Sequence, residues 1–247
     1  MKRSFMFSCA AALLLTGCGA SADEASAQLF AMDTVMQLDA YGHQVKQAVS
    51  DAEETIQALE ARLSRTREDS LVSVLNQNGA AQDLSAAEQA LLSEALTFRD
   101  ATGGAFDITI APVMDAWGFT GDSYRVPAQD ELDALLENVN SDEIRLSGSS
   151  VTLGAGQAID LGGIAKGYTS DCVEAVFREN KIESGKISLG GNVFVLGGKP
   201  DGADWRVGIR DPQDENALAA VLTLRDAYAI TSGGYERYFT ENGNTYH

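Results

Sequence analysis

Apolar residues recur at helical spacing in four parts of the chain. From residue 45 to 63 they lie four and three positions apart, which predicts a helix with one apolar face: Val45, Val49, Ala52, Ile56, Leu59 and Leu63. A second helix is predicted to begin after Ser85, whose spacing to Glu88 matches a capping box, and to end at Gly103-Gly104. Residues 128–139 predict a third helix. A fourth is expected to follow Lys166, with these side chains facing inward: Cys172, Val173, Val176 and Phe177.

Alternating apolar and polar positions predict strands between and after these helices. We expect a first strand over residues 31–42, another over 105–113 that closes at Pro112, and two short strands over 143–154. After residue 184 the pattern is mostly of strand type, and residues 199–204 (KPDGAD) predict a hairpin. Helices concentrate early and strands late. This order favours an α+β fold with mixed or antiparallel sheets over a doubly wound fold.

The first residues follow the pattern of an export signal. Basic Lys2 and Arg3 precede a short apolar run, and small residues follow it. Residues 15–18 (LTGC) resemble a bacterial lipobox, in which cleavage after residue 17 leaves a lipid-bearing Cys18. An ordinary signal peptide with a chance cysteine is the alternative. We therefore expect a signal over 1–17, a flexible tether over 18–28, one globular domain over 29–247, and a lipid anchor on the extracytoplasmic face of a bacterial membrane.

Charge and cysteine content narrow the possible partners. The chain carries 18 basic and 36 acidic residues, a net charge of −18, and loss of residues 1–17 would remove two of the basic ones. Such an acidic surface repels nucleic acid and anionic lipid, so we expect neither as a partner. Three cysteines give no disulfide framework, and Cys172 is expected to be a small buried hydrophobic residue rather than a nucleophile.

A glycine-rich segment lies at the predicted junction of strand and helix. Asp160 is followed by Gly162-Gly163 and then by Lys166. Bare backbone lets a ligand approach the main chain, and a helix N-terminus with a nearby ammonium group favours a phosphate. Because Walker and dinucleotide fingerprints are absent, a close strand–helix turn with a solvated lysine is equally compatible. Similar glycine clusters occur next to Asp107 and after Ser232.

The chain resembles the ApbE-type flavin transferases, the FAD:protein FMN transferases. Six segments carry the resemblance in order: 32–36 (MDTVM), 63–76, 102–119 (with TGGAFDITIAP), 159–171 (IDLGGIAKGYTSD), 188–212 and 229–247. The resemblance runs through nearly all of the chain after the tether. The resemblance implies the ApbE/T-fold type of α+β architecture.

The resemblance also implies a reaction and its site. FMN would pass from FAD to a Thr or Ser hydroxyl of a target flavoprotein, with release of AMP and with Mg²⁺ as the required cation. The positions implied to contact FAD are Met32, Ala105, Phe106, Asp107, Asp160 and Lys166, and the Gly163 carbonyl is the implied metal ligand. Thr231 and Ser232 are possible phosphate or ribose contacts. The alternatives are a FAD pyrophosphatase that uses water as acceptor and a non-catalytic flavin-binding lipoprotein.

Two features depart from the family pattern. Thr66 occupies a position where the family often has an aromatic residue for ring contact. Family chains also continue beyond "YH" into an "HxxDPxTG" segment and a further metal-binding stretch, so the sequence reads as C-terminally truncated and His247 receives no role. We therefore expect the 247-residue chain alone to bind magnesium weakly and to transfer little FMN.

Overall fold

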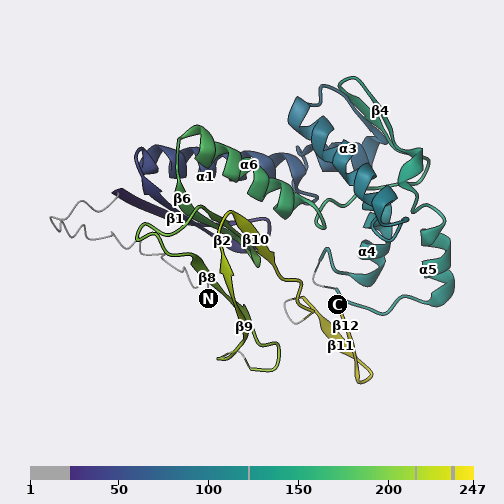
Figure 1. Cartoon of the computed structure of the whole chain (residues 1–247). Coiled ribbons are helices and arrows are strands. Elements are labelled where there is room, and N and C mark those ends of the chain that lie inside the picture. Colours follow the sequence, from purple (N-terminus) through teal and green to yellow (C-terminus); the bar gives the residue numbers. More distant parts are fainter. Residues whose placement is uncertain (1–22, 122, 215, 235–236) are drawn as a thin grey trace, which may run out of the picture.

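A computed structural model of the chain describes residues 23–121, 123–214, 216–234 and 237–247. It contains two lobes, each with its own hydrophobic core (Figure 1). The predicted signal over 1–17 and the predicted lipid-bearing Cys18 lie outside the described residues. No helix within the described ranges has the length and apolar character needed to cross a membrane.

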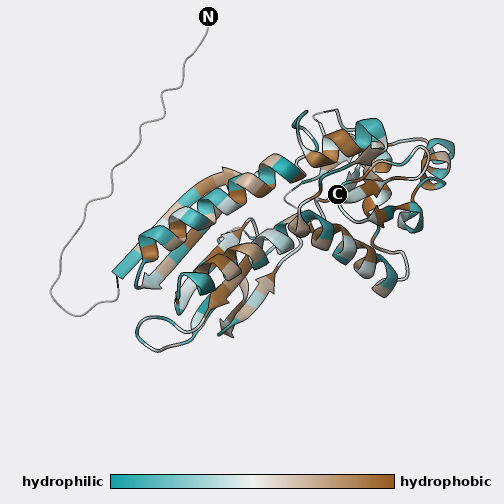
Figure 2. Ribbon diagram, turned by 90° about the horizontal axis from the view of Figure 1, so that it is seen from above, coloured by the Kyte–Doolittle hydropathy of each residue, from teal (hydrophilic) through white to brown (hydrophobic). Residues whose placement is uncertain are grey.

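The sheet lobe consists of a five-stranded antiparallel sheet with two helices on one face. The strand order is β1 (Asp23–Ala31), β2 (Thr34–Gly42), β6 (Ser184–Leu189), β7 (Asn192–Leu196) and β10 (Ala227–Ile230). Helices α1 (Val45–Leu63) and α6 (Ala165–Glu179) lie beside one another across it, as Figure 2 shows from above. Alternate residues of β2 point toward these helices, so that Met36, Leu38 and Ala40 are fully buried.

The helical lobe surrounds a small three-stranded sheet. Its helices are α2 (Leu71–Asn78), α3 (Ala86–Ala101), α4 (Ala111–Trp117) and α5 (Gln129–Leu136), with short 3₁₀ turns η1 (Ile108–Ile110) and η2 (Ser141–Glu143). The sheet has the order β3 (Ala80–Ala81), β5 (Ser150–Thr152), β4 (Arg145–Ser147). The predicted capping box at Ser85 and Glu88 is formed, and it opens α3 as expected.

Two antiparallel ribbons extend from the lobes. One pairs β8 (Trp205–Arg210) with β9 (Leu218–Leu224), and the other pairs β11 (Phe239–Glu241) with β12 (Asn244–Tyr246). The β11–β12 ribbon turns at Asn242-Gly243, both with positive φ, as a tight hairpin requires. Its rings pack on α4, because Phe239 and Tyr246 both contact Trp117.

The predicted α+β class with antiparallel sheets is confirmed, and so are the four predicted helices. The predicted strand over 105–113 is wrong. Asp107 instead caps η1 by accepting a hydrogen bond from the Thr109 N–H at 2.8 Å, and Pro112 lies in the first turn of α4. A short apolar run reads the same as strand or helix, and Pro is well suited to the first turn of a helix.

Two further sequence predictions need correction. The flexible tether expected over 18–28 is already strand β1 from Asp23 onward, because this segment pairs along its whole length with β2 and places Ala25, Ala27 and Leu29 against the core. Residues 199–204 form a local turn but not a hairpin, since β7 before them and β8 after them belong to different sheets. The tight β6–β7 hairpin instead turns at Gly190-Gly191.

Candidate functional site

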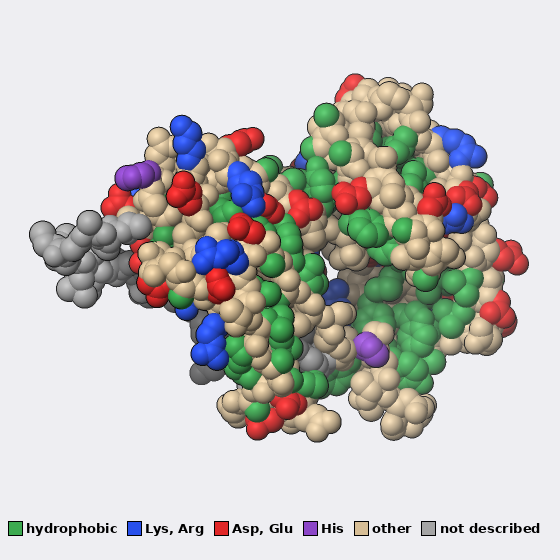
Figure 3. Space-filling model, viewed as in Figure 1, with side chains coloured by type: hydrophobic (Ala, Val, Ile, Leu, Met, Phe, Trp, Pro, Cys, Tyr) green, Lys and Arg blue, Asp and Glu red, His purple; other side chains and the backbone are tan. Residues whose placement is uncertain are grey.

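A cavity of about 1390 Å³ lies between the two lobes. Figure 3 shows this hollow, with hydrophobic side chains on its flanks and a basic side chain inside it. The volume exceeds the ~300–1,000 Å³ of ordinary small-molecule sites, so the cavity is large enough for an extended ligand. Among the residues implied by the resemblance, all of these line it: Met32, Ala105, Phe106, Asp107, Asp160, Gly163 and Lys166.

The glycine-rich segment forms one wall of the cavity, and its backbone is held from behind. Asn76 of α2 makes two hydrogen bonds to the main chain of Ile159, at 2.9 and 2.7 Å. Asp160 donates its N–H to the Ile108 carbonyl at 2.7 Å. Its carboxylate accepts the Gly162 N–H at 2.6 Å and forms an ion pair with Arg65 at 3.0 Å. The loop between strand and helix is therefore fixed before any ligand enters.

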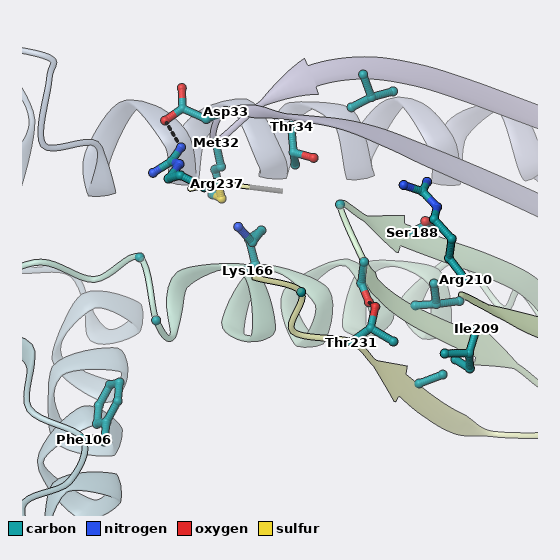
Figure 4. Close-up of a pocket in the computed structure, with 18 of the residues that line it drawn as sticks. Met32, Asp33, Thr34, Phe106, Lys166, Ser188, Ile209, Arg210, Thr231 and Arg237 are labelled. Carbon is teal, nitrogen blue, oxygen red and sulfur yellow. Dashed lines mark hydrogen bonds and ion pairs between the residues drawn. The ribbon is translucent and has the colours of Figure 1, made fainter. Parts of the chain in front are cut away.

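The first turn of α6 presents unpaired polar groups to this cavity. Gly163 and Lys166 line the cavity, and the Gly163 carbonyl and the Lys166 N–H make no hydrogen bond to another residue in the described part of the chain. The N–H of Gly167, which is not a lining residue, is also without a partner among the described residues. Lys166 itself forms no ion pair with any described residue, and Figure 4 shows its side chain pointing into the cavity. Free N–H groups at a helix N-terminus, together with an ammonium group, constitute an anion site. A phosphate fits this chemistry.

Phe106 faces the same space from the helical lobe (Figure 4). Its ring lies so close to the glycine turn that a Cβ atom on Gly163 would meet the Phe106 Cε2 atom at 3.0 Å. Phe98 packs edge-on against Phe106, with ring centroids 6.3 Å apart. Gly163 thus has a packing reason as well as the predicted binding role: the absent side chain lets the ring lie against the backbone.

Met32 occupies the tight turn between β1 and β2. It has a positive φ of 49°, and its N–H donates to Glu60 of α1 at 3.0 Å. The Met32 sulfur lies 3.7 Å from the buried Thr169 hydroxyl of α6, which donates its proton to the Ala165 carbonyl at 2.8 Å. In Figure 4 its side chain faces Lys166 across the cavity. The prediction that Met32 lies at the site is consistent with this position, and its polarizable sulfur suits contact with a flat ring.

Asp107 lines the cavity, but its carboxylate is directed toward the protein. It accepts hydrogen bonds from the backbone and hydroxyl of both Thr109 and Ser141, and only 7% of its side chain is exposed. Burial raises the pKa of this carboxyl, but the hydrogen bonds from Ser141 and Thr109 outweigh it and hold the pKa below its usual range. The charged side chain therefore organises the loop beneath Phe106.

Several residues that sequence reasoning did not select also line the cavity. Arg237 and Arg210 add basic side chains, and Arg237 pairs with Asp33 at 3.4 Å. Ser188 and the Gly190-Gly191 turn contribute from the sheet. These residues lie inside the segments that resemble the family, so the resemblance could have indicated them. Their spacing in the sequence does not distinguish them from ordinary strand residues.

Of the other residues that the sequence singled out, one lines the cavity and the others do not. Thr231 lines the cavity, and its N–H donates to the Gly191 carbonyl at 3.1 Å. Ser232 and Thr66 are exposed and are not among the lining residues. Cys172, which was expected to be a small buried hydrophobic residue, is only half-buried, and burial raises the pKa of its thiol.

The sequence is similar to those of a known protein family. The sequence model of the ApbE family matches residues 32–247. The FAD:protein FMN transferase of Treponema pallidum is 33% identical over 224 residues, which cover 83% of this chain and 62% of that protein. The Vibrio cholerae enzyme of the same name is 27% identical, with 99% of this chain and 76% of that protein covered. The chain thus spans about three-fifths of the length of the Treponema protein.

Solved structures show the same architecture. The crystal structure of the ApbE protein from Thermotoga maritima superposes with a TM-score of 0.84 at 28% identity, over 91% of this chain and 75% of that one. The flavin transferase ApbE from Vibrio cholerae gives 0.77 at 24% identity, over 90% and 75%, a likeness of fold.

Proposed function

The chain belongs to the ApbE family, and from this membership we propose that the protein transfers FMN from FAD to a Thr or Ser hydroxyl of a target flavoprotein. The hydroxyl oxygen forms a bond to the phosphorus on the FMN side, the bond from that phosphorus to the bridging oxygen breaks, and AMP leaves with the electron pair. The hydroxyl proton is released to solvent. The observation that carries the proposal is a large cavity with unpaired N–H groups and Lys166 at one helix N-terminus.

Each wall of the cavity has a task in this reaction. The Lys166 ammonium and the first N–H groups of α6 hold the diphosphate, where negative charge increases as AMP leaves. Phe106 and Met32 offer apolar surface to the flat ring systems of FAD. Because catalysis of phosphoryl transfer consists mainly of positioning and charge stabilisation, these groups need not form covalent intermediates.

Magnesium dependence is a prediction that the described residues do not support by themselves. In the described part of the chain no cluster of three or more His, Cys, Asp or Glu side chains can hold a metal ion. The Gly163 carbonyl is free of hydrogen bonds to described residues, but one carbonyl oxygen does not provide the several oxygen ligands that Mg²⁺ requires.

One incubation tests the proposal against its alternatives. The protein is mixed with FAD, Mg²⁺ and a candidate flavoprotein, and both AMP release and flavin fluorescence on the denatured acceptor are followed. We expect AMP and a covalently fluorescent acceptor in small yield, because the 247 residues alone are expected to bind magnesium weakly. An acceptor variant without the hydroxyl is the control and should remain unlabelled. FMN and AMP without labelling would indicate a pyrophosphatase. Bound but unaltered FAD would indicate a flavin-binding protein and would refute the proposed reaction.

We further propose that the protein is exported and anchored by a lipid on Cys18. The motif over residues 15–18 supports this proposal, as do the basic Lys2 and Arg3 and the short apolar run that follows them. Cells that express the protein and are fed a radiolabelled fatty acid should label the wild type and not Cys18→Ser. Equal labelling of both would contradict the anchor.

A further inference from the structure

Arg65 lies where three segments of the chain meet beside the cavity. It follows α1, and its guanidinium group contacts two carboxylates on other segments. The Nη1 atom is 3.0 Å from Asp160 Oδ2, and the Nη2 atom is 3.0 and 2.8 Å from the two carboxylate oxygens of Asp115 on α4. Only 14% of the Arg65 side chain is exposed. The residue itself is not among those that line the cavity.

The contact with Asp160 extends to the glycine turn. One carboxylate oxygen of Asp160 is held by Arg65, and the other accepts the Gly162 N–H at 2.6 Å. The carboxylate can therefore rotate only if it breaks one of these bonds. Gly162 is followed by Gly163 and then by the first turn of α6, which carries Lys166. A side chain outside the cavity lining is thus connected, through the Asp160 carboxylate, to the turn that precedes the predicted phosphate-binding groups.

The burial and the hydrogen bonds of Arg65 distinguish it from a residue in an ordinary surface ion pair. Its Nε atom is buried without a hydrogen-bond partner among the described residues, which costs free energy. Its carbonyl accepts the Ser73 hydroxyl at 2.9 Å, so the main chain is fixed as well. The two terminal nitrogens bind the carboxylates of Asp160 and Asp115, and in this orientation Nε has no acceptor among the described residues. Lysine, with one ammonium group, cannot bind both in this planar arrangement.

We propose that Arg65 is a positioning residue, which acts through Asp160 and Gly162 to hold the glycine turn and the N-terminus of α6 in the binding geometry. The consequence for FAD rests on the function proposed above. Removal of Arg65 should release the Asp160 carboxylate, loosen the Gly162 N–H and weaken diphosphate binding, while the two hydrophobic cores stay intact.

Hydrogen exchange at the Gly162 amide tests the proposal directly in the full chain. In Arg65→Gln the Gly162 amide should exchange about tenfold faster or more, as expected for loss of a charge-assisted hydrogen bond, and FAD titrated into the protein should bind about tenfold more weakly. Arg65→Lys should restore part of both. Asp115→Asn is the matched control, because it removes the other partner of Arg65 and leaves the Asp160 contact, so Gly162 should remain protected.

The outcomes separate this proposal from the proposed function. Unchanged Gly162 exchange in Arg65→Gln would overturn the positioning role, whether or not FAD affinity changes. If Arg65→Gln does not fold, Arg65→Met carries the test, because it also removes the contact with Asp160, and wild-type exchange at Gly162 in that variant would overturn the proposal. A wild-type protein that does not bind FAD would refute the proposed function, while the exchange measurement would still decide whether Arg65 holds the turn.

Discussion

At the scale of single residues, the cavity lining combines a glycine, Gly163, that leaves room for the Phe106 ring with a lysine, Lys166, that supplies positive charge. The sequence alone indicated that bare backbone near Gly163 and a cation at Lys166 belong to one site, and the structure brings both to the cavity. It could not indicate that Phe106 packs on Gly163, or that the Asp107 carboxylate turns away from the cavity. Those facts depend on tertiary contacts between segments more than 30 residues apart, such as Asp107 with Ser141.

Gly163→Ala tests the contact between turn and ring. The new Cβ atom would lie 3.0 Å from Phe106 Cε2, so the ring or the turn has to shift. We expect FAD to bind about tenfold more weakly, a change of ~1.4 kcal/mol, as measured by quenching of flavin fluorescence. Gly121→Ala is the matched control, since Gly121 is not among the lining residues and nothing lies within 4 Å of its Cβ position. Equal losses in both variants would contradict the account.

Lys166→Gln tests the cation. Because Lys166 has no ion-pair partner among the described residues, its replacement should leave the melting temperature unchanged. FAD affinity should fall about tenfold, and its dependence on salt should decrease, because one charge contact with phosphate is lost. Lys46→Gln, on the exposed face of α1, should change neither quantity. A salt dependence identical to that of the wild type would show that Lys166 does not contact the ligand's phosphates.

At the scale of elements, a local motif with a specific chemistry predicted its helix correctly, whereas apolar periodicity in a short segment predicted the wrong element. The capping box at Ser85 and Glu88 satisfies free N–H groups wherever it occurs, so it predicted α3 correctly. The apolar run at 105–113 is too short to distinguish strand from helix, and the fold makes it η1 and α4. Strand β1 was missed because its Ser and Ala residues resemble a linker until β2 pairs with them.

Ser85→Ala tests the cap of α3. The Ser85 hydroxyl accepts the Glu88 N–H at 3.2 Å, and its loss should lower the free energy of unfolding by about 0.5–2 kcal/mol. Chemical denaturation measures this change. Because α3 lies outside the cavity lining, FAD affinity should stay at the wild-type value. A variant as stable as the wild type would show that the cap contributes nothing to α3.

At the scale of the whole molecule, two separately packed lobes create the cavity between them. Each lobe contains buried carboxylates that depend on hydrogen bonds: Asp39 in the sheet lobe, and Glu88 and Asp107 in the helical lobe. Burial raises the pKa of each, but their partners outweigh it and hold all three pKa values below the ordinary range. Those partners are Lys186 and Ser26 for Asp39, Arg62 and Ser85 for Glu88, and Ser141 and Thr109 for Asp107.

This pattern predicts how stability depends on pH. A lowered folded-state pKa means that the unfolded chain binds protons more readily, so the stabilisation is complete above the ordinary carboxyl pKa of about 4. It is lost as the pH falls further, through the lower folded values. Urea denaturation from pH 7 to pH 2 should show a stability that declines below pH ~4.5. Asp107→Asn should weaken that decline, and an unaltered decline in this variant would contradict the assignment.

The account depends most on the claim that the cavity recognises a dinucleotide through its diphosphate. Equilibrium titration of the wild-type protein with FAD and with riboflavin, which has the same ring system and no phosphate, tests it most directly. We predict that FAD binds at least about a hundredfold more tightly, a difference of ~2.8 kcal/mol. Equal affinity for the two compounds would contradict the claim, because the ring alone would then account for binding and the N-terminus of α6 would hold no phosphate.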